Sequence, residues 1–169
     1  TRLGENHYIM TTTTGGAANV LGKLEDYLQT EWPELDVYLT SVTDHYATAS
    51  VCGPNSKKIL NKIVPDIELS DENFPHMSFK EAKIGNINCR IMRISFTGEL
   101  SYEINVQASY GKSVWEKCIE AGKEFNITPY GTETMHLLRA EKGFIIVGQD
   151  TDGTMTPIDL QMDWIVSKK

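Results

Sequence analysis

The clearest hydrophobic pattern in the chain is a strict alternation of polar and apolar residues from Ser101 to Gln107. Alternation with a period of two is typical of a β-strand with one face buried and the other face polar. Glu103 falls on the polar face of the predicted strand. The apolar face consists of Tyr102, Ile104 and Val106.

A turn is predicted directly before this strand, at Thr97-Gly98-Glu99, because Gly98 can adopt a positive φ. The segment from Ile87 to Phe96 is apolar on both faces, as expected of a central strand, and follows a hairpin turn at Gly85-Asn86. Two apolar strands therefore flank a turn, and two carboxylates lie four residues apart, Glu99 in the turn and Glu103 on the strand that follows it.

Three stretches with helical periodicity separate the remaining strands. One begins at Gly15-Gly16 and ends at Trp32-Pro33, and another has Pro54 at its first position, with Ile59 and Leu60 pointing inward. The last is an amphipathic helix that contains Val114, Cys118, Ile119 and Phe125. The other predicted strands are His7 to Thr12, Val37 to Val42 and Tyr46 to Cys52. This order predicts an α+β fold with antiparallel sheets and flanking helices.

Composition narrows the classes of function. The 169 residues carry a net charge of -7, which argues against a nucleic-acid-binding surface. No apolar stretch approaches the length needed to cross a membrane, and no signal peptide is visible. The three cysteines, an odd number, favour reduced thiols in a cytoplasmic protein, and the four histidines show no metal-ligand spacing.

Two sequence blocks resemble a known family. Residues 94–104 resemble the Phe/Tyr-Thr-Gly-Glu-x-x-Tyr-Glu signature of the folate-binding aminomethyltransferases, which include the glycine cleavage T-protein and the C-terminal parts of sarcosine and dimethylglycine oxidases and dehydrogenases. Residues 129–144 contain Leu-Arg-Ala-Glu-Lys-Gly, similar to the family's Leu-Arg-x-Glu-x-Gly. Gly148-Gln149-Asp150, Thr156-Pro157 and Trp164 keep the family's order and approximate spacing.

The resemblance implies a T-protein-like folate-binding fold in two lobes. Residues 1–64 would be the second half of a first lobe with a split βαβ (ferredoxin-like) unit, residues 65–80 a connector, and residues 81–169 the second lobe. The chain begins without methionine just before a turn at Gly4-Glu5-Asn6, and at its other end Trp164-Ile165-Val166 runs into Lys168-Lys169 without a cap. We therefore expect a fragment of a larger subunit.

The resemblance also implies roles for individual residues. Glu103 would anchor the pterin ring, because a carboxylate accepts two adjacent N–H donors side by side. Glu99 and Tyr102 would shape the pocket wall, and Arg139 would contact the ligand or brace the site. The family's catalytic aspartate would lie just upstream of Thr1, so the catalytic residues stay unknown, and no metal is implied. The anionic folate tail would need local basic residues, for which the candidates are Arg90, Arg93, Arg139 and Lys142.

One departure points to a branch of the family. Thr134-Met135-His136 stands where T-proteins have Ala-Arg-Asp, which looks closer to α subunits of heterotetrameric sarcosine oxidases. In such enzymes sarcosine is oxidised at a flavin on a partner subunit, and tetrahydrofolate captures the one-carbon unit as 5,10-methylenetetrahydrofolate. FAD or FMN and NAD would bind elsewhere in the complex, and the fragment alone would be inactive.

Two other interpretations remain open at this stage. The chain could belong to a glycine cleavage aminomethyltransferase, which needs a lipoylated carrier partner, or to a dimethylglycine oxidase or dehydrogenase. It could also be a non-catalytic subunit-interaction module. In that case replacing Glu103 by alanine would affect only folding.

Overall fold

The structure is a computed structural model that describes residues 1–167. The predicted end of the chain at Lys168-Lys169 therefore lies outside the described residues. The chain divides into two compact units, Thr1–Tyr46 and Ala47–Lys169. None of the helices in the described part is long and apolar enough to span a membrane.

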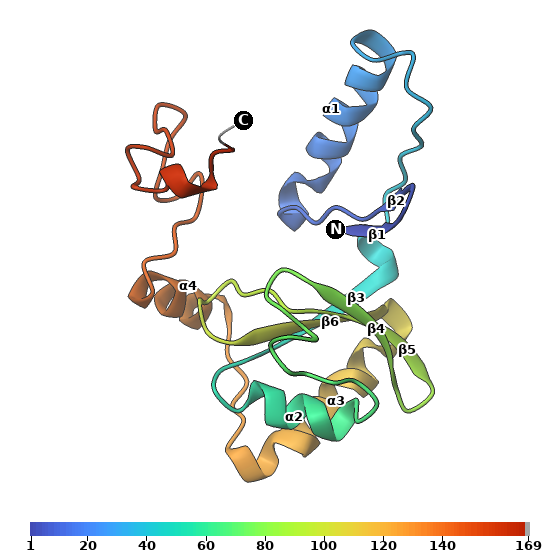
Figure 1. The fold of residues 1–169 in the computed structure, drawn as a ribbon, viewed down its shortest axis with the longest axis vertical. Coiled ribbons are helices and arrows are strands. Elements are labelled where there is room, and N and C mark those ends of the chain that lie inside the picture. The colour runs from blue at the N-terminus through green and yellow to red at the C-terminus, as the bar shows by residue number, and fades with distance from the viewer. Residues whose placement is uncertain (168–169) are drawn as a thin grey trace. The chain divides into compact units, whose positions relative to one another are not determined.

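The first unit contains a short hairpin and one helix (Figure 1). Strand β1 (Arg2–Gly4) pairs antiparallel with β2 (His7–Tyr8), and helix α1 spans Ala17–Thr30. The predicted helix after Gly15-Gly16 is confirmed. The strand predicted from His7 to Thr12 is limited to two residues.

The strand predicted from Val37 to Val42 is wrong, because the structure assigns no strand to these residues. A β-strand is stable only when a second strand accepts its hydrogen bonds. The only sheet of this unit is the two-stranded β1–β2 hairpin, so residues 37–42 have no strand partner within it. The alternation of apolar residues in this segment is typical of a strand, but no neighbouring strand of this unit pairs with it.

The second unit contains a four-stranded sheet with the strand order β3-β6-β5-β4. Short 3₁₀ turns lie at Thr14–Gly16, Thr43–His45, Ala108–Tyr110, Lys123–Phe125 and Asp163–Ile165. The strands are β3 (Tyr46–Cys52), β4 (Phe79–Ile84), β5 (Ile87–Met92) and β6 (Ser101–Gln107). The helices are α2 (Ser56–Ile63), α3 (Gly111–Gly122) and α4 (Thr132–Glu141).

All strand pairs of this sheet run antiparallel. Strands β4 and β5 form the predicted hairpin, in which Ile84 pairs with Ile87 and Gly85 adopts a φ of 62°. Strand β5 pairs with β6 antiparallel. Between β3 and β6, Gly53 N–H donates to the carbonyl of Leu100 and Thr48 bonds Asn105, so sequence numbers rise on one strand as they fall on the other.

The α+β class with antiparallel sheets and flanking helices is therefore confirmed. The split βαβ unit predicted within residues 1–64 is not formed there, because β3 pairs with β6 from the second half of the chain. Helix α2 also begins at Ser56 rather than at Pro54, which lies in the turn after Gly53. Gly53 has a φ of 103°, so the chain turns sharply before the helix starts.

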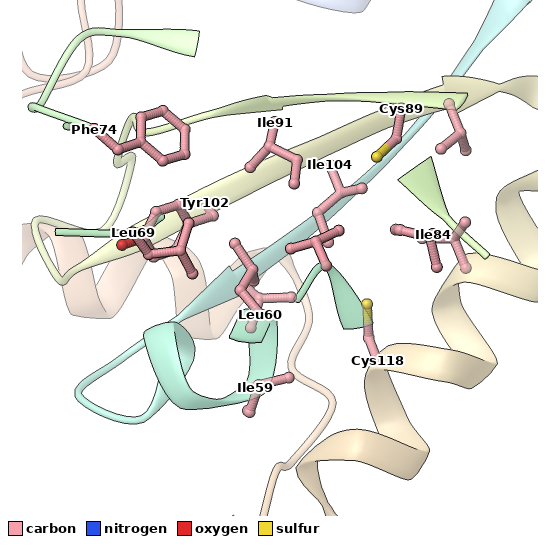
Figure 2. Packing of buried hydrophobic residues seen from close by; sticks show 14 residues of the cluster. Ile59, Leu60, Leu69, Phe74, Ile84, Cys89, Ile91, Tyr102, Ile104 and Cys118 are labelled. Carbon is pink, nitrogen blue, oxygen red and sulfur yellow. The ribbon is translucent and has the colours of Figure 1, made fainter. Parts of the chain in front are cut away.

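The core lies between the sheet and helices α2 and α3, which Figure 1 shows on the same side of the sheet. The predicted alternation in β6 is confirmed, since Tyr102, Ile104 and Val106 are all at most 2% exposed. Figure 2 shows Ile59 and Leu60 of α2 and Cys118 of α3 turned toward the sheet residues Ile91 and Ile104. These contacts remove a continuous apolar surface from water and stabilise the unit.

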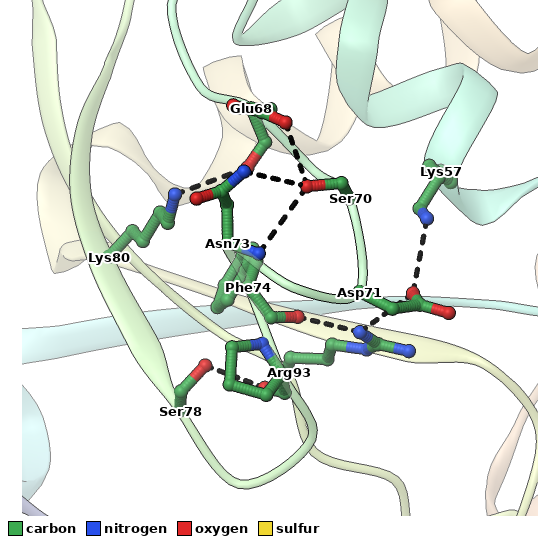
Figure 3. A network of polar contacts seen from close by, with 10 residues as sticks. Lys57, Glu68, Ser70, Asp71, Asn73, Phe74, Ser78, Lys80 and Arg93 are labelled. Atoms are coloured by element: carbon green, nitrogen blue, oxygen red, sulfur yellow. Dashed lines mark hydrogen bonds and ion pairs between the residues drawn. The ribbon is translucent and has the colours of Figure 1, made fainter.

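The segment 65–80, predicted as a connector, contributes two residues to this same core. Leu69 is 3% exposed and Phe74 is fully buried, with its ring centroid 5.7 Å from that of Tyr102. The segment's polar residues hold it in place (Figure 3). The guanidinium of Arg93 donates to the carbonyl of Phe74 at 2.6 Å and pairs with Asp71 at 2.9 Å. The assignment of residues 1–64 and 81–169 to two family lobes stays a prediction.

Replacing Phe74 by alanine should destabilise the second unit by about 3–5 kcal/mol, because the change leaves a cavity against Tyr102. The measurement is urea denaturation followed by circular dichroism. Glu72→Ala, in the exposed part of the same segment, is the control and should change stability by less than about 0.5 kcal/mol. Equal stability of the two variants would show that the segment is not part of the core.

Candidate functional site

Glu103 lies on the polar face of β6, opposite the core. It is half-buried, and none of the residues 1–167 forms an ion pair or a hydrogen bond with its carboxylate. Burial raises the pKa of this carboxyl group above its ordinary value of 4.5, because a partly desolvated carboxylate is less stable than the neutral acid. A half-buried carboxylate without a protein partner is available to a ligand that donates hydrogen bonds.

Small polar side chains border Glu103 on its β3 side, and on its β5 side the buried Met92 lies directly opposite it. The hydroxyls of Ser50 and Ser101 lie 3.3 Å apart, and the hydroxyl of Thr48 donates to the side-chain oxygen of Asn105 at 2.7 Å. These contacts join β3 to β6 along the row that contains Glu103. The sheet therefore presents this carboxylate beside a set of hydroxyl and amide groups.

The loop between α3 and α4 reaches the same edge of the sheet. The thiol of Cys52, the last residue of β3, donates to the hydroxyl of Tyr130 at 3.0 Å. The pKa of Tyr130 is raised to about 12, mainly by burial and then by its contact with Cys52, with a further contribution from the negative charge of Glu103. Tyr130 is thus a neutral phenol held near Glu103.

The Thr97-Gly98-Glu99 turn lies against the start of the 142–144 segment. Gly98 has the predicted positive φ, at 79°. A β-carbon at this position would come within 2.7 Å of the β-carbon of Lys142. The Glu99 carboxylate forms a salt bridge of 2.9 Å with the Lys142 ammonium group. The two motif blocks of the sequence therefore touch each other at Gly98, Glu99 and Lys142.

Arg139 is buried in α4, with 8% of its surface exposed. Its guanidinium pairs with the Asp150 carboxylate and donates to the carbonyl of Phe144 at 3.0 Å. Hydrogen bonds from the backbone N–H of Ile146 and from Arg139 lower the pKa of Asp150, which therefore stays ionised. In this structure Arg139 braces the segment after α4, and the role expected for it at the site stays a prediction.

The four predicted site residues do not converge on one point. Tyr102 is fully buried on the core face of β6, so it supports the strand from behind rather than facing the same side as Glu103. Glu99 and Arg139 both contact the segment that follows α4, through Lys142 and Asp150. Only Glu103 presents an unpaired charge.

Sequence reasoning did not identify Tyr130 or Cys52 as members of the site. Tyr130 stands in the second motif block, where the signal was the Leu-Arg-Ala-Glu-Lys-Gly core rather than the residues before it. Both residues also line a cleft of about 770 Å³ beside β3, which is walled by α2, α3 and residues 125–135. Glu99 reaches this cleft, and the residues that line it do not include Glu103. Among residues 1–167 no three His, Cys, Asp or Glu side chains gather as metal ligands would.

Replacing Gly98 by alanine should destabilise the unit by about 1–3 kcal/mol, because the new side chain would be strained at positive φ and would press on Lys142. Gly85→Ala is a matched control, since Gly85 also has a positive φ but has no atom within 4 Å of the new β-carbon. Urea denaturation should show a clearly larger loss for Gly98→Ala. Equal losses of stability in the two variants would mean that Lys142 can move away from the new side chain at little cost.

Comparison with known proteins adds the family. The GCVT N-terminal domain family matches residues 1–169. Sarcosine oxidase subunit alpha from Corynebacterium sp. (strain P-1) is 59% identical over 99% of this chain, and its counterpart from Rhizobium meliloti (strain 1021) is 45% identical over 98%. The chain spans 17% of the length of each of these relatives. An aminomethyltransferase from Thermoanaerobacter sp. (strain X514) is 32% identical over 78% of this chain and 35% of its own length.

A solved structure agrees on the fold. A chain of heterotetrameric sarcosine oxidase from Corynebacterium sp. U-96 superimposes with a TM-score of 0.52 and 23% identity, over 64% of this chain and 54% of that one. At this identity the likeness concerns the fold alone. The family match covers the whole chain, and the sarcosine oxidase α subunits are similar over nearly all of it. The chain therefore belongs to the GCVT N-terminal domain family.

Proposed function

We propose that this chain binds tetrahydrofolate through Glu103, as the folate-binding domain of a sarcosine oxidase α subunit. The observation that carries the proposal is the half-buried Glu103 carboxylate, which has no ion-pair or hydrogen-bond partner among residues 1–167. Desolvating a carboxylate without a partner destabilises the fold, so the arrangement makes sense where a ligand supplies the missing hydrogen bonds.

The pterin ring of folate matches this carboxylate chemically. One edge of the ring carries two adjacent N–H donors, and an ionised carboxylate has two oxygens that accept such a pair side by side. The surrounding serine, threonine and asparagine side chains bond one another across β3 and β6, which leaves the carboxylate as the strongest acceptor on this face. The residues present therefore fit the pterin group.

The basic residues considered for the anionic folate tail already have acidic partners. Arg90 pairs with Glu81 at 2.7 Å, and Lys142 pairs with Glu99 at 2.9 Å. Arg93 and Arg139 pair with Asp71 and Asp150. Lys142 has 47% of its side chain exposed, compared with 14% or less for the three arginines, so it is the most accessible cation for the tail.

Within a sarcosine oxidase the proposed role is to hold folate where the one-carbon unit is released. Bound tetrahydrofolate supplies nitrogen atoms that accept this unit, giving 5,10-methylenetetrahydrofolate. In this proposal Glu103 orients the pterin ring, and the surface of the chain limits the access of water to the bound folate. The flavin, NAD and the oxidation of sarcosine belong to other parts of the proposed complex and its partner subunits.

The alternatives differ in what they require of Glu103. A subunit-interaction module without folate would retain a destabilising, unpaired carboxylate for no benefit, which argues against that function. A T-protein-like aminomethyltransferase would use Glu103 in the same way. The 59% identity to a sarcosine oxidase α subunit, compared with 32% to an aminomethyltransferase, favours the sarcosine oxidase.

Glu103→Gln should weaken binding of 5-formyltetrahydrofolate by about 10- to 100-fold, because the amide loses the charge assistance and replaces one acceptor by a donor. Isothermal titration calorimetry of the chain measures this effect, with circular dichroism to confirm folding. Glu81→Gln, which removes an exposed carboxylate from β4, is the control and should bind normally. Equal affinity of wild type and Glu103→Gln would contradict the proposal.

The same substitution should stabilise the fold at neutral pH. The folded-state pKa of Glu103 is raised, so the native protein binds its proton more tightly than the unfolded chain. The stability of the wild type therefore falls as the pH rises from the pKa of Glu103 in the unfolded chain through its pKa in the folded protein. Glu103→Gln has no carboxyl group at this position, so this loss of stability should not occur in the variant. Thermal unfolding should show a higher Tm for the variant at pH 7 and a smaller difference below pH 4.5. A lower Tm at pH 7 would show that Glu103 stabilises the fold.

A further inference from the structure

Tyr130 is a polar residue near Glu103 to which the proposed function assigns no role. Its loop is fixed to the end of β3 by the hydrogen bond from the Cys52 thiol, at 3.0 Å. Two residues earlier on the same face of β3, Ser50 contacts Ser101 of β6 at 3.3 Å. Ser101 in turn lies two residues from Glu103 on the same face of β6, about 7 Å along the strand.

The protonation state of Tyr130 makes it a donor. Its oxygen lies 3.0 Å from the Cys52 sulfur, which is a weak hydrogen-bonding partner, and the Ser50 hydroxyl is a further neighbour. The pKa near 12, raised first by burial, keeps this proton in place at neutral pH. Near the acceptor Glu103, the site therefore has a protonated O–H group that can donate to a ligand.

Pterin chemistry requires both kinds of group. The two adjacent N–H donors that suit a carboxylate are the ring N3–H and the 2-amino group, and the next position on the ring carries a 4-oxo oxygen, which is an acceptor. We infer that the Tyr130 hydroxyl donates to this 4-oxo group while Glu103 accepts from N3–H and the 2-amino group. This inference rests on the proposed function and names the residue that selects the 4-oxo form of the ring.

A 4-amino pteridine would meet the wrong partner at this point. Its amino group presents hydrogens to the Tyr130 hydroxyl, and a site built around a donor discriminates against a ligand that lacks the acceptor. Folic acid and aminopterin differ at position 4, and the 4-amino ring of aminopterin also lacks the hydrogen on N3. The chain should therefore bind folic acid more tightly than aminopterin. The preference of wild type reflects both Glu103 and Tyr130, and the change of this preference in a Tyr130 variant reports on Tyr130.

The test measures the affinities of both probes for wild type and Tyr130→Phe by calorimetry at pH 7.5. Loss of the hydroxyl should weaken the binding of folic acid by about three- to tenfold and change the affinity for aminopterin by less than about twofold. The ratio of the two affinities should therefore fall. Tyr38→Phe is the control, because Tyr38 is 89% exposed and belongs to the first unit. Cys52→Ser keeps a donor for the Tyr130 oxygen and should keep the preference.

The outcomes separate this inference from the proposed function. Equal weakening of both probes in Tyr130→Phe would indicate a structural role for the ring and would overturn the inference, as would unchanged affinities. Binding of folic acid by wild type but not by Glu103→Gln would support the proposed function whatever the result for Tyr130→Phe. If folded wild-type chain binds neither probe, the proposed function fails and the inference fails with it.

Discussion

The pairing of β5 with β6 is the constraint on which the rest of the second unit depends. In its register Ile91 lies opposite Ile104 and Met92 opposite Glu103. A slip of one residue would turn the whole apolar row of β6 to the polar face and carry the Glu103 carboxylate into the core. The free energy gained by burying Tyr102, Ile104 and Val106 is therefore also what holds Glu103 in position.

Features that depend on neighbouring residues could be predicted from the sequence. The alternation in β6, the hairpin at Gly85 and the positive φ of Gly98 all follow from local chemistry, and the structure shows each of them. Features that depend on a distant partner could not be predicted. Residues 37–42 have strand-like composition but no strand partner, and β3 pairs with a strand from the other half of the chain. The burial of Leu69 and Phe74 was hidden by the polar residues around them.

The same distinction between local features and distant contacts applies to the residues of the candidate site. The face of β6 on which Glu103 lies could be predicted because the period of a strand fixes it locally, whereas a role for Glu103 in binding was implied only by the family resemblance and stays a prediction. Tyr130 reaches the sheet only through a loop between two helices, and its contact with Cys52 joins residues 78 positions apart. Arg139 was expected either to contact the ligand or to brace the site, and only the structure shows that its guanidinium bonds Asp150 and the Phe144 carbonyl.

The two sequence motifs are linked by a physical contact, which explains why they occur together. The absence of a side chain at Gly98 lets the Thr-Gly-Glu turn lie against Lys142, and Lys142 neutralises Glu99. The second block thus contacts the turn that leads into β6, while the ion pair of the buried Arg139 with the partly exposed Asp150 holds the second block. Glu99 and Asp150 therefore both have cationic partners, Lys142 and Arg139. Glu103, four residues after Glu99, has no partner among residues 1–167, and the contacts that hold the turn and β6 set the position of the carboxylate that the proposed folate site requires.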